Sequence, residues 1–153
     1  MERREFIALL GMAAAPASAQ AGPPSEVSLR GMLLGEWSLV SSINTRRDGG
    51  STDRWGPNPK GILMFGRSGH FAQVITGSES RMFGSKTYCA FGTFATVPGT
   101  KAILLHFEGS SIAKQIGSDQ ERHIVHLTVD ELKYINPVTA VGTSAEVLWK
   151  RIT

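Results

Sequence analysis

The chain has 153 residues, of which 41% are hydrophobic and 19% are charged, and its formal net charge is +3. This length fits one domain, and the composition is that of a globular protein and excludes an intrinsically disordered chain. The basic residues are dispersed and form no run of five or six, so the sequence favours a solvated surface and does not indicate a nucleic-acid partner.

Residues 1–19 have the features of a bacterial export signal. Two arginines near the start precede a short apolar run, and Ala17-Ser18-Ala19 has the small-x-small pattern of a signal peptidase site. The apolar run is too short to span a bilayer as a stable helix. We therefore expect cleavage after Ala19, or alternatively after Ala21, and a periplasmic or secreted mature protein without a transmembrane segment. The arginine pair resembles a twin-arginine signal, and an ordinary secretory signal is the alternative.

The mature chain is predicted to be an all-β domain at residues 29–153, preceded by a flexible leader at residues 20–28 that is rich in proline, glycine and serine. Leucines near helical spacing indicate a short helix at residues 29–34. Beyond it, short runs of β-branched and aromatic residues alternate with glycine-containing turns, as in antiparallel β-proteins. Eight strands are predicted, at residues 35–43, 61–66, 70–77, 88–97, 101–108, 121–129, 132–136 and 145–152.

Three tight turns and two long connections join these strands. The turns are predicted at residues 66–69, where Gly69 takes a positive φ, and at residues 97–100 and 129–132. The long connection 44–60 shows no regular pattern, whereas 109–120 has room for a short helical turn. Loops of this length in a compact domain are usually functional or mobile.

Eight antiparallel strands can close into an up-and-down barrel that holds one small ligand. Closure places the last strand beside the first. Trp37 then acquires a basic partner, Lys150 or Arg151, across its indole ring, an attraction of about 0.5–2 kcal/mol. The indole is expected to cover the closed end of the barrel, and Gly35 is expected to leave room for the ring.

The Gly-x-Trp motif and the basic residues near the C-terminus resemble those of the lipocalins. The whole sequence is similar to the bacterial lipocalin-like domain family, which has a calycin-like β-barrel. The matching stretches are LLGEWSLVS (33–41), GPNPKGILMFGRSGHFAQV (56–74), YCAFGTFA (88–95), HFEGS (106–110), GSDQERHI (117–124) and VLWKR (147–151). The resemblance covers nearly the whole mature chain and implies a barrel with a pocket. An export signal departs from the family pattern, so a cytoplasmic biosynthetic role is not expected.

Strand alternation divides the side chains between the two faces of the sheet without deciding which face is internal. The family resemblance favours the face of His106 and Glu108 as the pocket face, and a solvated surface pair is the alternative. The other candidate ligand-binding residues are Gln73, Tyr88, Phe91 and Arg122, with Phe94 and Met64 as further apolar candidates. Trp55, in the first long connection, is the seventh candidate ligand-binding residue; it is expected to pack against the rim of the barrel, and a lid over its mouth is the alternative.

The function predicted on this basis is the binding of a small hydrophobic or amphipathic molecule in the barrel cavity. The alternative is an isomerase, cyclase or hydrolase in which His106 and Glu108 form an acid/base pair in the cavity. A third hypothesis is a stress or scaffold protein without a ligand. The sequence predicts no metal site and no cofactor, since it lacks their motifs. Cys89 is expected to be a small buried apolar residue. The sequence indicates neither an oligomeric state nor the identity of the ligand.

Overall fold

The structure, a computed structural model, describes residues 26–78, 85–97, 99–137 and 143–153. The expected export signal at residues 1–19 and residues 20–25 of the expected leader lie outside the described residues. Helix α1 spans Glu26–Leu33. Residues 26–28, which were expected in the leader, are therefore helical.

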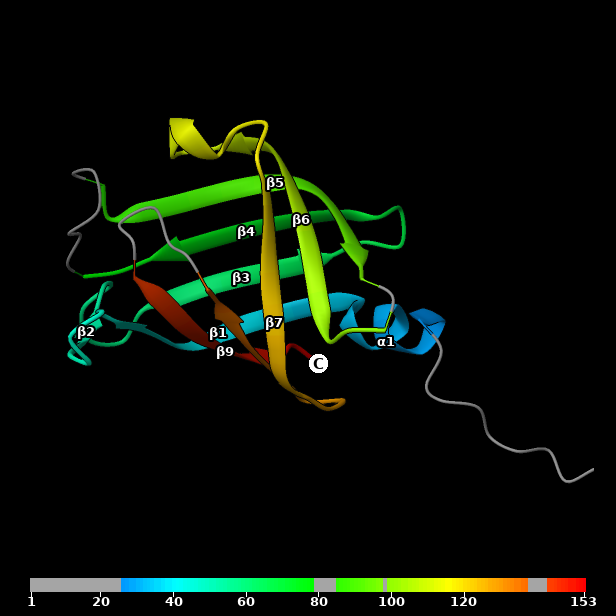
Figure 1. Cartoon of the computed structure of the whole chain (residues 1–153), viewed down its shortest axis with the longest axis horizontal. Helices are drawn as coiled ribbons and strands as arrows, with labels where there is room; N and C mark the ends of the chain where they lie inside the picture. The colour runs from blue at the N-terminus through cyan, green and yellow to red at the C-terminus, as the bar shows by residue number, and fades with distance from the viewer. Residues whose placement is uncertain (1–25, 79–84, 98, 138–142) are drawn as a thin grey trace, which may run out of the picture.

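Antiparallel strands make up almost all of the remaining structure (Figure 1). The strands are β1 (Gly35–Thr45), β2 (Ser51–Asp53), β3 (Lys60–Phe65), β4 (His70–Thr76), β5 (Thr87–Thr96), β6 (Ala102–Ser110), β7 (Asp119–Leu127), β8 (Glu131–Asn136) and β9 (Ser144–Arg151). From β3 to β9 each strand pairs with the next along the chain; β1 pairs with β3 and also with β9. This closes the predicted barrel of eight strands, β1 and β3–β9.

The structure tests the predictions for the hairpin turn at residues 66–69 and for the two long connections. In the turn at residues 66–69, Gly69 has a φ of 87° and its N–H donates to the Gly66 carbonyl at 3.0 Å, so this hairpin is confirmed. The second long connection contains the expected helical turn, a 3-10 helix (η1) at Ala113–Gln115. The prediction for residues 44–60 was wrong in one part. A turn between Arg46 and Gly50 brings β2 back along the end of β1, where Ile43 and Thr45 pair with Asp53 and Ser51.

Helix α1 and strand β2 lie at opposite ends of the barrel (Figure 1). Large apolar side chains fill the interior toward the α1 end. Among the fully buried residues there are Trp37, Trp149, Phe107, Leu63 and Leu105. The aromatic rings pack in pairs, with ring centroids 4.8 Å apart for Phe65 and Phe94 and 5.4 Å apart for Phe71 and Phe107. This end of the barrel is therefore a packed apolar core.

Arg151 and Trp37 join the first strand, the last strand and the helix. They are direct partners across β1 and β9, and the guanidinium carbon of Arg151 lies 4.1 Å from the centroid of the indole. Arg151 also donates to the carbonyls of Leu34 and Met32, at 2.7 and 2.6 Å, and Trp37 Nε1 donates to the Leu33 carbonyl at 2.9 Å. The last carbonyls of a helix lack partners within it, so these bonds cap α1. Of the two basic residues proposed as partner of Trp37, Arg151 is the one observed.

Gly35 makes room for a different side chain from the one expected, although its positive φ agrees with the turn that was expected to lead into the strand. A Cβ atom at this position would lie 2.7 Å from Nη1 of Arg151, and the backbone φ is 122°. The glycine therefore makes room for the guanidinium rather than for the indole ring. Its positive φ also suits glycine better than any other residue.

We expect Arg151→Met to lower the free energy of unfolding by about 2–4 kcal/mol, because it removes charged hydrogen bonds and the cation–π contact while keeping the aliphatic stem. Lys150→Met is the matched control, since Lys150 is exposed on the same strand; it should change stability by no more than about 0.5 kcal/mol. Urea denaturation followed by circular dichroism measures both. Equal effects of the two substitutions would contradict the role given to Arg151.

Candidate ligand-binding cavity

A cavity of about 60 Å³ lies in the barrel at the end opposite α1. Such a volume has room for about four water molecules or a small chemical group. Its wall comes from the ends of the strands, from η1 and from the segment that follows β2. The lining residues are Ser42, Asn44, Arg54, Trp55, Gln73, Ile75, Tyr88, Ile112, Gln115, Arg122, Tyr134, Asn136, Ala145 and Val147.

Four of the seven candidate ligand-binding residues line this cavity: Trp55, Gln73, Tyr88 and Arg122. Each is buried, with no more than 8% of its surface exposed. Gln73 and Tyr88 face inward on β4 and β5, as the buried positions of those strands alternate. The structure thus brings together residues that are up to 67 positions apart in the sequence (55 to 122).

His106 and Glu108 lie on the outer face of β6, so the expectation that they point into the cavity was wrong. The large buried side chains of this strand are Ile103, Leu105 and Phe107, and alternation directs His106 and Glu108 outward. His106 Nδ1 contacts Asp119 Oδ1 at 2.6 Å, and both side chains are about half exposed or more, at 47% and 64%. The proposed acid/base pair is therefore not in the cavity.

Phe91 also lies outside, with 54% of its surface exposed. Its ring covers Gly109 on the neighbouring strand, where a Cβ atom would lie 2.3 Å from Phe91 Cε1. Cys89, on the same face of β5, is exposed rather than buried as expected. Of the further apolar candidates, Met64 is exposed, whereas Phe94 is buried in the core near α1. The alternation of β5 explains the outward positions, because its even-numbered residues face inward.

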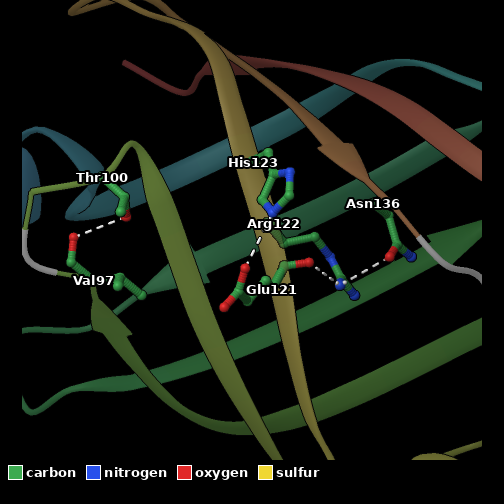
Figure 2. A network of polar contacts seen from close by, with 6 residues as sticks. All are labelled: Val97, Thr100, Glu121, Arg122, His123 and Asn136. Carbon is green, nitrogen blue, oxygen red and sulfur yellow. Dashed lines mark hydrogen bonds and ion pairs between the residues drawn. The ribbon is translucent and has the colours of Figure 1, made fainter.

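Arg122 is the most deeply buried charged residue of the cavity, with 5% of its surface exposed. Its Nη1 donates to the Glu121 carbonyl and to Asn136 Oδ1, at 3.0 and 3.2 Å, and its Nη2 donates to Gln120 Oε1 at 3.1 Å. Figure 2 shows the side chain reaching from β7 toward Asn136 at the end of β8. Burial lowers the pKa of Arg122 because the charged form is removed from water.

Burial makes the tyrosines of the cavity harder to ionise. Tyr88 donates a hydrogen bond to Gln115 Oε1 at 2.8 Å, and the Ser110 hydroxyl donates to the same oxygen at 2.7 Å. Burial raises the pKa of Tyr88 to about 12 and also raises that of Tyr134. Both phenols therefore stay protonated to a higher pH than an exposed tyrosine does.

Trp55 forms part of the cavity wall through a segment that lies over the end of β4. Its ring centroid is 6.5 Å from that of Tyr88, with the planes tilted by 43°. The Trp55 N–H donates to Asp53 Oδ1 at 3.0 Å, which fixes a local turn. A Cβ atom at Gly77 would lie 2.1 Å from the Trp55 carbonyl oxygen, so this glycine allows the two backbones to approach.

Sequence reasoning missed the polar residues at the end of β1. The register of β1 against β9 shifts between Leu39 and Ser41, and after this bulge Ser42 and Asn44 face inward. Strict alternation from Trp37 would have placed them outside, and nothing in the sequence marks the bulge. With its amide oxygen oriented toward Arg54, Asn44 accepts from Nε and Nη2 at 2.9 and 3.0 Å. Tyr134 could have been found by alternation, because it is two residues from the apolar Leu132.

The raised pKa of Tyr88 predicts the behaviour of the protein at alkaline pH. Because Tyr88 is harder to ionise in the folded state, its contribution to stability is complete below pH about 10, the unfolded pKa, and is lost as the pH rises to about 12. The sequence has two tyrosines, and both line the cavity. In an alkaline titration, tyrosinate absorbance should therefore rise at a higher pH in folded protein than in urea-unfolded protein. Coincident titration curves would contradict the buried tyrosine pair.

Gly77→Ala should displace Trp55 and shift its fluorescence toward that of an exposed indole, because the added methyl group occupies the position of the Trp55 carbonyl. A cost of about 1–3 kcal/mol in unfolding free energy is expected from such overpacking. Gly31→Ala in α1 is the control: a Cβ atom there meets nothing within 4 Å, and alanine favours a helix. Unchanged fluorescence in Gly77→Ala would contradict the close approach of the Gly77 and Trp55 backbones.

The barrel has counterparts among solved structures at low sequence identity. A redesigned β-barrel has a TM-score of 0.50 and 12% identity, covering 82% of this chain and 96% of that one. A lipocalin-like protein from Bacteroides uniformis ATCC 8492 has a TM-score of 0.46 and 13% identity, covering 79% and 99%. Bovine odorant-binding protein, in complex with a selenium-containing odorant, has a TM-score of 0.47 and 17% identity, covering 92% and 78%.

No protein-family model matches the sequence, and neither does any curated protein. Identities this low show a shared fold alone. The order and closure of the strands, together with the likeness to the redesigned barrel, confirm the predicted fold class. The chain folds as an all-β, eight-stranded antiparallel up-and-down barrel.

Proposed function

We propose that the protein is an exported binding protein for a small amphipathic molecule, which it holds in the cavity beneath Trp55. The observation that supports this proposal is that the cavity wall combines apolar side chains with a few polar ones. Ile75, Ile112 and Val147 supply apolar surface, while Gln73 and Arg122 supply hydrogen-bond donors in the same space. Ligand sites in proteins typically combine an apolar wall with a few placed polar groups.

The size of the cavity limits the ligand. At about 60 Å³ it is much smaller than the roughly 300–1,000 Å³ of pockets that enclose drug-sized molecules. The proposal is therefore a small ligand, or a larger one whose polar group alone enters and whose apolar part extends toward Trp55. Trp55 lies between β2 and β3 rather than in a barrel strand. Its displacement would widen the cavity without breaking the pairing of the barrel strands.

Export is the second part of the proposal and rests on residues 1–19. Their charged start, short apolar run and small residues before the expected cleavage site support removal in the periplasm or on secretion. Among the described residues, the helices are too short or too polar to cross a membrane.

Catalysis is not proposed. The enzymatic alternative depended on His106 and Glu108 in the cavity, and both lie on the outer face. His106 instead forms a surface pair with Asp119. Such exposed pairs contribute little to stability and have no access to a ligand inside the barrel.

Native mass spectrometry tests both parts of the proposal. The full chain is expressed in a bacterium and recovered from the periplasm or the medium. The polypeptide should lack its first 19 or 21 residues and should retain one small molecule of defined mass. Ala145→Leu should lose that molecule, because an isobutyl group replaces a methyl group in the cavity wall.

Glu146→Gln is the matched control and should retain the molecule, since Glu146 faces outward and pairs with Lys133 at 3.0 Å. Wild-type protein without any bound molecule would contradict the binding function. A mature chain that still begins at Met1 would contradict export independently.

A further inference from the structure

We infer that the ligand of this cavity carries a carboxylate, which binds the guanidinium of Arg122 with Arg54 alongside. The inference rests on the proposed binding function and narrows it from small amphipathic molecules to small organic anions.

The first observation is the state of Arg122. Only 5% of its surface is exposed, and its hydrogen-bond partners in the described structure are the Glu121 carbonyl, the side-chain amides of Asn136 and Gln120, and the Tyr134 phenol. All four are uncharged. Buried charges in proteins are normally paired with an opposite charge, because neutral acceptors recover only part of the lost hydration. An anion in the cavity would supply the missing counter-charge.

The second observation is where the carboxylates lie. None of the described residues that line the cavity is an aspartate or a glutamate. The acids closest in sequence to Arg122 are paired on the outer face. Figure 2 shows Glu121 in contact with His123, at 3.1 Å, and Asp119 contacts His106. Strand alternation thus places Arg122 inside and its acidic neighbours outside, so no described carboxylate of the cavity wall pairs with Arg122.

The third observation concerns the polar side chains that lie near Arg122 in the cavity. Arg54 lines the same cavity, and the Tyr88 phenol lies within electrostatic range of both guanidinium groups. Burial lowers the pKa of Arg122, as expected for a guanidinium that is removed from water. The protonated phenols of Tyr88 and Tyr134 carry no negative charge that could pair with Arg122. A carboxylate offers two acceptor oxygens that match the fork of a guanidinium.

The apolar part of the wall fits the rest of such a ligand. Ile75, Ile112 and Val147 line the cavity together with Arg122. A short aliphatic carboxylate would place its charge at Arg122 and its chain against these side chains. An arginine that only bridged β7 and β8 through Asn136 would instead show no preference for charged over neutral ligands.

Hexanoate and hexanamide form a matched pair of probes, because they share shape and chain length and differ in charge. Binding to purified protein is followed by tryptophan fluorescence, since Trp55 lines the cavity, or by backbone amide NMR. Hexanoate should bind about 10- to 100-fold more tightly than hexanamide, the range of one charge-assisted hydrogen bond. Arg122→Gln should remove the preference and Arg54→Gln should reduce it. Arg47→Gln, an exposed position, removes the same charge and should leave the preference intact.

Equal binding of the two probes to wild-type protein would overturn the inference and leave the proposed function standing. A preference that survives in Arg122→Gln would overturn the assignment to this residue. If neither probe binds, the cavity does not accept a carboxylate, and the retained mass in native spectra still decides whether it binds anything. Should Arg122→Gln fail to fold, the wild-type comparison together with Arg54→Gln decides the question.

Discussion

The barrel depends on the contact between Arg151 and Trp37. An open eight-stranded sheet would expose two edges, and pairing β1 with β9 removes both. Arg151 holds this seam at one end by stacking on the indole and by donating to the carbonyls that end α1. Its Nε also donates to the Val129 carbonyl, next to the turn between β7 and β8. The Arg151 side chain therefore contacts the helix, the first strand and a neighbouring turn. Gly35 leaves space for its guanidinium because glycine has no Cβ atom.

The strands and their order could be predicted from sequence because the signals are local. Short runs of apolar and β-branched residues mark the barrel strands, and glycine marks turns such as the one ending at Gly69. Strand β2 was missed because Ser51–Asp53 has no apolar pattern and forms only by pairing with the end of β1. The start of α1 was missed for a similar reason, since Glu26–Ser28 follow a stretch rich in proline, glycine and serine.

The candidate site was harder to predict because it depends on which strand face is internal. In β6 the run Ile103–Leu105 is apolar at every position, so the inward face is decided by Phe107 and by tertiary packing. The pairing of β5 with β6 passes over Glu108, and a Cβ atom at Gly92 would lie 1.8 Å from the His106 carbonyl oxygen. Bulges of this kind change the relation between position and face, and they depend on contacts with other strands. The candidates Gln73, Tyr88 and Arg122, which line the cavity, lie on strands where alternation is uninterrupted around them.

Two arginines at opposite ends of the barrel interior have different surroundings. Arg151 is partly exposed and fully engaged by an aromatic ring and by helix carbonyls, so its charge closes the fold. Arg122 lies at the other end of the interior, where its described partners are neutral and a cavity remains beside it. The segment carrying Trp55 is likewise held by local contacts with Asp53 and Gly77 rather than by the seam. The end of the barrel that holds the cavity can therefore change its shape or its charge while the seam at the opposite end keeps the sheet closed.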